Sequence, residues 1–176
     1  MKLQEVKDLI PDYGSDIRLN LESLLSAEVA GLSAHQVWGT ALACAYSIGS
    51  TELVQMVLTE GAADLDDPLK TAAQGAATIM AMNNVYYRSM HLMEDADLKR
   101  LPARLRMNII GKPGVPKVDF ELMCFAVSAL AGCGQCLTSH LHELRKASLS
   151  DEGVQGALKI ASVLSAADRA LKIREL

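Results

Sequence analysis

Residues with high helix propensity dominate this chain, and that pattern constrains its fold more than any other feature. Ala, Leu, Met, Glu and Lys recur along its length, whereas the alternating β-branched runs of half-buried strands are missing. Two Phe and one Trp leave the core to Ala, Leu, Val, Ile and eight Met. That composition favours closely packed helices over an aromatic-rich sandwich, so the sequence predicts an all-α, multihelical fold.

Several of the expected helices begin at residues that can cap them. Ser33 is a candidate N-cap, and Asp67 stands before Pro68, which suits the first helical position. Ser150 precedes two acids that suit the positive end of a helix. We expect helices at 2–10, 16–27, 33–47, 51–60, 68–90, 119–131, 133–147 and 151–174.

Two segments of the chain resemble each other. QGAATIMAMNNVYYR starts at residue 74 and QGALKIASVLSAADR at residue 155, and the two also share Ile79 with Ile160 and Arg88 with Arg169. Chance similarity between Ala-rich helices is one interpretation, and a duplicated helical unit is the other. Under the second, residues 1–176 form a single domain that has three parts. These are a first repeat at about 16–100, a Pro- and Gly-rich linker at about 101–117 and a second, catalytic repeat at about 118–176.

Charge and hydropathy exclude several classes of protein. A net charge of −4, without a Lys/Arg stripe, argues against a nucleic-acid partner. Charges interrupt the N-terminal stretch where a signal peptide would need an apolar run, and no run approaches the ~18 residues of a membrane span. We therefore expect a cytoplasmic protein. In a reducing compartment, a close pair among four cysteines is more often catalytic or metal-binding than structural.

Cys133 and Cys136 form such a pair, followed four residues later by His140. On a helix, with about 100° per residue, the three side chains fall on one face. Gly132 and Gly134 suggest that a new helix starts here, and the positive end of a helix lowers the pKa of a thiol. The spacing also allows a disulfide within one turn, so that an oxidised sulfur is captured by its neighbour. The segment therefore indicates thiol redox chemistry.

His140 can accept a proton from a thiol one turn away and later return it to a leaving oxygen. A carboxylate that holds the imidazole would complete this relay, and two candidates exist. Glu143 lies one turn further along the same expected helix. Glu121 interrupts an apolar run on the preceding helix, where a buried acid without a partner would be costly. Spacing alone does not choose between them.

Each of these residues has a second interpretation. The cysteine pair also suits half of a zinc site, although the second pair that a structural zinc would need is missing. Haem attachment would need His directly after the second cysteine, where the chain has Leu137. His140 as a surface residue and Glu121 as an ordinary first-turn acid are further alternatives. Cys44 and Cys124 suit core thiols, and the Met residues suit core filler. The other histidines are interpreted as structural or surface residues: His35, His91 and His142.

With these residues in view, the chain resembles the alkyl hydroperoxidase D (AhpD) family of the carboxymuconolactone-decarboxylase-like superfamily. The resemblance is carried by Glu121, eleven intervening residues, Cys133-Gly134-Gln135-Cys136, three more residues and His140. The stretch MAMNNVYYR, from residue 80, is similar to the first-repeat helix of that family. Family members often have His where this chain has Gln135, a departure that leaves the relay to His140 alone.

The resemblance implies an antioxidant, all-helical homotrimer that reduces organic hydroperoxides and regenerates an AhpC-type peroxiredoxin. By this analogy Cys136 is the sulfur that peroxide attacks, through a sulfenic acid, and forms the mixed disulfide with the partner. Cys133 is the resolving thiol and proton donor, paired in a Cys133–Cys136 disulfide, although helix-end electrostatics alone would make Cys133 the better thiolate. His140 and Glu121 form the relay, in preference to Glu143. No bound cofactor is implied, and the reductant is a dihydrolipoamide-type thiol, for example on a lipoylated dehydrogenase-complex subunit.

Two other functions are to be separated from this one. A redox adaptor would reduce a peroxiredoxin while having little peroxidase activity of its own. A decarboxylase of the same superfamily would act on a lactone acid and would not need the cysteine pair. Peroxide turnover with and without the partner, and the effect of thiol alkylation, distinguish the three.

Overall fold

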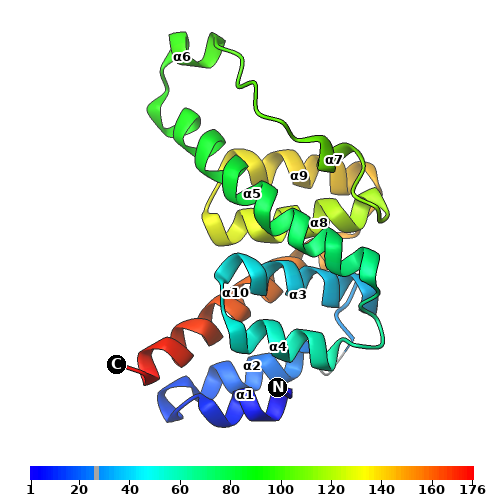
Figure 1. The fold of residues 1–176 in the computed structure, drawn as a ribbon, viewed down its shortest axis with the longest axis vertical. Helices are drawn as coiled ribbons and strands as arrows, with labels where there is room; N and C mark the ends of the chain where they lie inside the picture. Colours follow the sequence, from blue (N-terminus) through cyan, green and yellow to red (C-terminus); the bar gives the residue numbers. More distant parts are fainter. Residues whose placement is uncertain (26–27) are drawn as a thin grey trace.

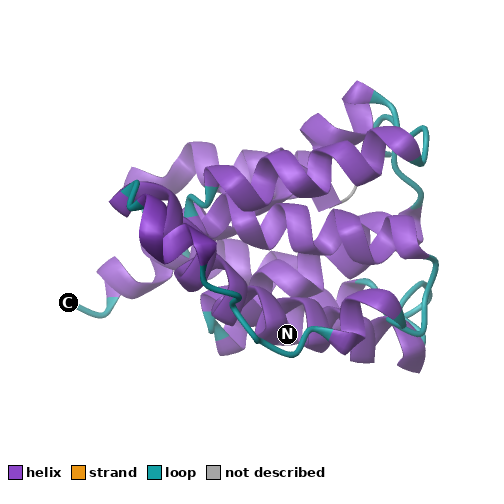
Figure 2. Cartoon of the chain, turned by 90° about the horizontal axis from the view of Figure 1, so that it is seen from above, coloured by secondary structure: helices purple, strands orange, loops and turns teal. Residues whose placement is uncertain are grey.

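The computed structural model describes residues 1–25 and 28–176, and in these residues it contains helices and no strand (Figures 1 and 2). The all-α prediction is confirmed. The end of the helix expected at 16–27 lies outside the described residues. The elements are α1 Leu3–Leu9, the 3-10 turn η1 Asp12–Gly14, α2 Ser15–Leu25, α3 Ala34–Ile48, α4 Thr51–Glu60, α5 Asp67–Met93, α6 Ala96–Arg100, α7 Asn108–Gly111, α8 Lys117–Ala131, α9 Gly134–Lys146 and α10 Asp151–Arg174.

Two helices, α3 and α8, pack against each other at the centre of the molecule. From Asp119 to Ser128 every residue of α8 is buried, as expected of a helix that is apolar all round. The long helices α5 and α10 each contact both central helices, while α4 packs on α3 and α9 packs on α8. The core is therefore continuous from one half of the chain to the other.

The same succession of elements occurs twice in the chain. In each half, a central helix ends at a glycine in the left-handed region, Gly49 with φ 77° after α3 and Gly132 with φ 65° after α8. The next residue, Ser50 or Cys133, caps a second helix with its side chain. A long helix follows, α5 or α10. This succession supports the duplication, whose boundaries stay a prediction.

The glycine of each QGA motif lies where another segment crosses a long helix closely. A Cβ at Gly75 of α5 would collide with the side chain of Ile109, in α7. A Cβ at Gly156 of α10 would lie 2.7 Å from Cγ1 of Val29, in the segment before α3. The shared motif therefore marks equivalent close contacts in the two halves.

The helix starts agree with the predicted caps at two of three places. Ser33 accepts a hydrogen bond from Gln36 N at 3.2 Å, and Ser150 accepts one from Gly153 N at 3.1 Å. At α5 the predicted cap is wrong by one residue, because Asp66 rather than Asp67 accepts the bond from Leu69 N. Pro68 is therefore the second residue of α5 rather than the first, and it still lies in the first turn.

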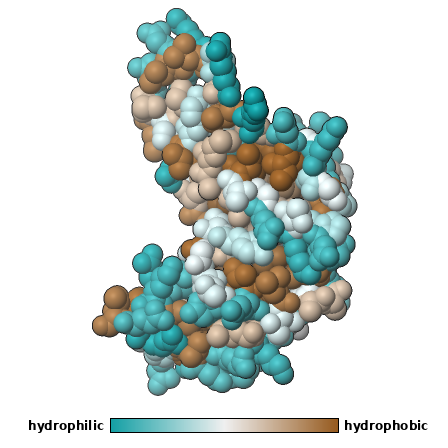
Figure 3. Space-filling model, in the orientation of Figure 1, coloured by the Kyte–Doolittle hydropathy of each residue, from teal (hydrophilic) through white to brown (hydrophobic). Residues whose placement is uncertain are grey.

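The region between the halves is more structured than the sequence indicates. The short helices α6 and α7 were not expected, and α7 lies inside the predicted linker. The distal end of α5 and α6 project away from the core (Figure 1), and apolar side chains gather there (Figure 3). Within the described part of the chain, no helix has both the length and the apolar character needed to cross a membrane.

Candidate active site

Both cysteines of the pair lie at the turn between α8 and α9. Cys133 is the N-cap of α9, and its Sγ accepts a hydrogen bond from Cys136 N at 3.3 Å. Ser50 Oγ does the same for Leu53 N, at 3.4 Å, where α4 begins. The sulfur of Cys133 thus takes the place of a capping oxygen and lies at the positive end of the α9 dipole. As predicted from the flanking glycines, a new helix starts at the pair.

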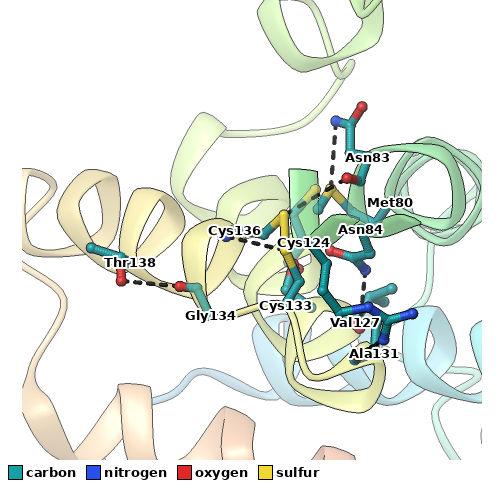
Figure 4. The surroundings of a disulfide bond; sticks show 12 residues. Met80, Asn83, Asn84, Cys124, Val127, Ala131, Cys133, Gly134, Cys136 and Thr138 are labelled. Carbon is teal, nitrogen blue, oxygen red and sulfur yellow. Dashed lines mark hydrogen bonds between the residues drawn. A yellow bond between two sulfur atoms is a disulfide. The ribbon is translucent and has the colours of Figure 1, made fainter. Parts of the chain in front are cut away.

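Cys133 and Cys136 are joined in a disulfide, with their Cα atoms 5.3 Å apart (Figure 4). The two residues differ in access. Cys133 is completely buried, whereas Cys136 lines a cavity of about 680 Å³. The sequence predicted that Cys133, Cys136 and His140 share one face. Cys136 and His140 do line this cavity together, but Cys133 lies behind them and does not line it.

Glu121 and His140 form a buried pair in the wall of the same cavity. His140 Nδ1 lies 2.6 Å from Glu121 Oε2, and the two side chains are only 10% and 5% exposed. An ionised carboxylate can only accept a hydrogen bond, so the ring proton belongs on Nδ1. The second ring nitrogen, Nε2, is then left as a proton acceptor. The pairing places Glu121 rather than Glu143 against the imidazole.

Glu143 has another partner. Its Oε2 lies 2.5 Å from Lys117 Nζ, at the start of α8, and Lys117 Nζ lies 3.9 Å from Glu121 Oε1. The hydrogen bond with Glu143 raises the pKa of Lys117, and the same bond is the main reason that the pKa of Glu143 is lowered. Glu121 thus lies between a lysine and a histidine.

Helices α5 and α7 supply another part of the cavity wall, and most of it is apolar. Met80 and Tyr87 come from α5, and Met107 and Ile110 come from the α7 region. The backbone oxygen of Asn83 lies 4.0 Å from Cys136 Sγ (Figure 4). The cavity therefore offers an apolar surface next to a sulfur, an imidazole and a carboxylate.

Sequence reasoning missed the residues of α5 that hold the end of α8. Asn84 Nδ2 donates to Val127 O at 3.5 Å (Figure 4), and Arg88 donates to Ala131 O. Both carbonyls lie near the C-terminal end of α8, just before the cysteines, and that of Ala131 is among the last four, which lack helical partners. A signal was present, because two adjacent asparagines interrupt an otherwise apolar helix face and Arg88 matched the second repeat.

Cys44 and Cys124 are free thiols buried in the core, as predicted. Burial raises the pKa of Cys44 to about 12, and burial together with the negative charge of Glu121 raises the pKa of Cys124. His35 lies 3.6 Å from Asp119 and joins α3 to α8, while His91 and His142 are exposed. Within residues 1–25 and 28–176, no three His, Cys, Asp or Glu side chains are grouped closely enough to hold a metal ion.

Comparison with known proteins gives the chain its relatives. Residues 96–176 match the model of the carboxymuconolactone decarboxylase family. Over 94% of its length the chain is 50% identical to alkyl hydroperoxide reductase AhpD of Streptomyces griseus and 47% identical to that of Rhodospirillum centenum, covering 93% and 88% of those proteins. It is 47% identical to AhpD of Hyphomonas neptunium over 97% of its length and 94% of that relative. The chain therefore belongs to the AhpD family.

Proposed function

We propose that the protein is a thiol-dependent alkyl hydroperoxide reductase in which Cys136 is the sulfur that attacks peroxide. The observation that carries this proposal is the cavity that reaches Cys136, His140 and Glu121 but not Cys133. A hydroperoxide that enters it meets one sulfur, with a proton acceptor and its carboxylate in the same wall. The relatives named alkyl hydroperoxide reductase AhpD support the same reaction.

The oxidative half of the cycle has two steps. His140 takes the proton of Cys136, and the thiolate attacks the terminal oxygen of ROOH, so that the O–O bond breaks and Cys136 becomes a sulfenic acid. The leaving alkoxide takes a proton from His140 or from the Cys133 thiol and departs as ROH. Cys133 then attacks the sulfenic sulfur, which forms the Cys133–Cys136 disulfide and releases water. Two electrons have passed from the two sulfurs to the peroxide.

The reductive half needs a dithiol, and we propose a dihydrolipoamide-type thiol as co-substrate. Its thiolate attacks Cys136, the sulfur that lines the cavity, and Cys133 leaves as a thiolate. The N–H of Cys136 and the positive end of α9 stabilise that leaving group. A second attack within the reductant releases Cys136 and closes the disulfide of the oxidised reductant. No bound cofactor takes part in this cycle.

The test is turnover of an organic hydroperoxide with dihydrolipoamide, together with a count of thiols lost after one equivalent of peroxide. We expect turnover and the loss of two thiols, with Cys133 and Cys136 linked in the peptide map. The variant Cys136→Ser should lose both. Unchanged turnover in that variant would refute the assignment, and decarboxylation of a lactone acid that is untouched by alkylation of both thiols would favour a decarboxylase-type site.

We further propose that Cys136 forms a mixed disulfide with an AhpC-type peroxiredoxin and so regenerates it. The same accessible sulfur supports this step, since the Cys136 thiolate lines the cavity and can attack a disulfide of the partner, whereas Cys133 is buried. Mixing the Cys133→Ser variant with the oxidised partner should trap a covalent complex through Cys136. A protein that traps the partner but has no turnover of its own would be a redox adaptor.

We propose that the chain acts in the cytoplasm as a homotrimer, with α5 and α6 at the contact between subunits. Large apolar side chains are exposed on this projecting part, and a patch of this kind on a monomer commonly marks an interface. Their exposed fractions are Val85 60%, Leu92 71%, Met93 53% and Leu98 40%. In the variant Leu92→Asp, the mass of the assembly measured by light scattering should fall below that of the wild-type protein. Equal mass for the variant and the wild type would refute this contact.

A further inference from the structure

We propose that Lys117 is a positioning residue of the proton relay, whose positive charge, held in place by Glu143, keeps Glu121 ionised and His140 available as a base. The inference rests on the proposed function, because it assigns Lys117 to the pair through which Cys136 loses its proton. It adds a residue outside the motif of acid, cysteines and histidine.

The two oxygens of the Glu121 carboxylate have different neighbours. Oε2 is bound to His140 Nδ1 at 2.6 Å, and Oε1 lies 3.9 Å from Lys117 Nζ. Lys117 opens α8 and precedes Glu121 by four residues, so both side chains lie on one face of the helix. A buried carboxylate is therefore flanked by a cation on one side and by the catalytic imidazole on the other.

Glu143 fixes the position of this cation. The Lys117 side chain is 59% exposed, and a lysine in that position would ordinarily sample many rotamers. Its bond to Glu143 Oε2, at 2.5 Å, ties it to α9 three residues after His140. The bond also raises the pKa of Lys117, so the side chain stays charged over the range in which thiols are titrated. The acid that sequence spacing offered as a partner of His140 is thus the partner of Lys117.

Other titratable groups surround the pair from each packed element. Helix α9 contributes Cys136, Glu143 and Lys146, α8 contributes Cys124, and α5 contributes Tyr87, while Met107 and Ile110, at α7, are not titratable. Among the described residues, no lysine or arginine other than Lys117 lies within 4.0 Å of Glu121. Lys146 lines the same cavity without such a contact and provides a matched control.

The sign of the effect follows from charge. A cation beside Glu121 favours the ionised carboxylate, which can only accept the Nδ1 proton of His140 and so leaves Nε2 as the base. When the cation is removed, the carboxylate loses this support, and Cys136 should then lose its reactivity at a higher pH. In a pH profile of Cys136 reactivity, the acid limb is the range in which reactivity falls as the pH is lowered. This limb should move upward by about half to one pH unit at low salt, and by less at high salt, because an exposed charge is screened.

The experiment follows alkylation of Cys136 by iodoacetamide in the reduced, full-length protein, read at that residue by peptide mass spectrometry between about pH 5 and pH 9. In Lys117→Gln the acid limb should move upward, and in Lys117→Arg, which keeps the charge, it should stay near that of the wild type. Lys146→Gln should move it clearly less than Lys117→Gln. Circular dichroism verifies that the variants are folded, as expected for an exposed side chain.

A double-mutant cycle with Glu121→Gln decides whether Lys117 acts through Glu121. In that background Lys117→Gln should cause no further shift. The inference is overturned if the single variant coincides with the wild type, if Lys146→Gln shifts the limb as far, or if the shift persists without Glu121. Alkylation needs no hydroperoxide, so a lack of peroxide turnover would refute the proposed function while the alkylation profile still decides the role of Lys117.

Discussion

The Nδ1 of His140 on α9 lies 2.6 Å from the Oε2 of Glu121 on α8, and both side chains are buried. This contact joins two helices that meet at the cysteine turn. It fixes the orientation of the imidazole and the nitrogen that carries its proton.

Glu121→Gln should slow peroxide reduction roughly 10- to 100-fold, because the amide holds the ring but no longer stabilises a positive charge on it. The melting temperature should change little, since Gln has the same shape. Single-turnover kinetics with an organic hydroperoxide measures the rate. Glu143→Gln serves as the control and should cost less, and a larger effect there would mean that the relay runs through the other acid.

Cys133→Ser should stop the cycle at the sulfenic acid of Cys136, because the serine hydroxyl cannot close a disulfide. Dimedone added with one equivalent of peroxide should label Cys136 in this variant, as seen by peptide mass spectrometry. Cys136→Ser should give no dimedone adduct. An adduct on Cys133 in that second variant would reverse the roles assigned to the two sulfurs.

Cys44 should resist alkylation in the native protein. Its pKa is raised to about 12 by burial, so at pH 8 only about one molecule in ten thousand carries the thiolate that reacts. Cys124, whose pKa burial also raises, should behave alike. In the reduced protein, iodoacetamide should therefore modify Cys136 first, and peptide mapping tests this order. Modification of Cys44 at the rate of Cys136 would show that the core opens readily.

Ser50→Ala should destabilise the protein by about 1 kcal/mol, because it removes the oxygen that accepts the Leu53 N–H at the start of α4. For a chain of this length, that corresponds to a melting temperature lower by about 2–4 °C. Ser47→Ala, on the exposed side of α3, is the matched control and should change stability little. Equal losses in the two variants would mean that the Ser50 cap contributes nothing.

The fold was largely predictable from the sequence, because helix propensity and capping act locally. Ser33 and Ser150 each cap a helix through an amide three residues further along the chain. Asp66 and Asp67 are adjacent acids that can both cap, so local chemistry does not decide between them. The short helix α7 lies between segments rich in proline and glycine, where its contact with α5 at Gly75 stabilises it and the sequence does not reveal that contact.

Spacing along the chain indicated the candidate residues of the site, while the choice of the acid beside His140 came from the family resemblance alone. Cys133, Cys136 and His140 are close in sequence, so spacing alone brings them together. The choice between Glu121 and Glu143 depends on how α8 packs on α9, which spacing along one helix does not contain. Asn84 and Arg88 act on backbone oxygens of another helix, and such contacts leave no motif near the cysteines.

The turn after α3 and the turn after α8 are built alike, and they differ in the residue that caps the next helix and in the third residue of that helix. Where the second has the sulfur of Cys133, the first has the oxygen of Ser50, and Leu53 occupies the third position of its helix as Cys136 does in α9. The reactive turn therefore differs from the other by having sulfur in place of oxygen at a position that accepts a hydrogen bond from a backbone amide in both. The turn after α3 has the same construction without thiols. The substitutions Ser50→Cys and Leu53→Cys would therefore introduce a second thiol pair there.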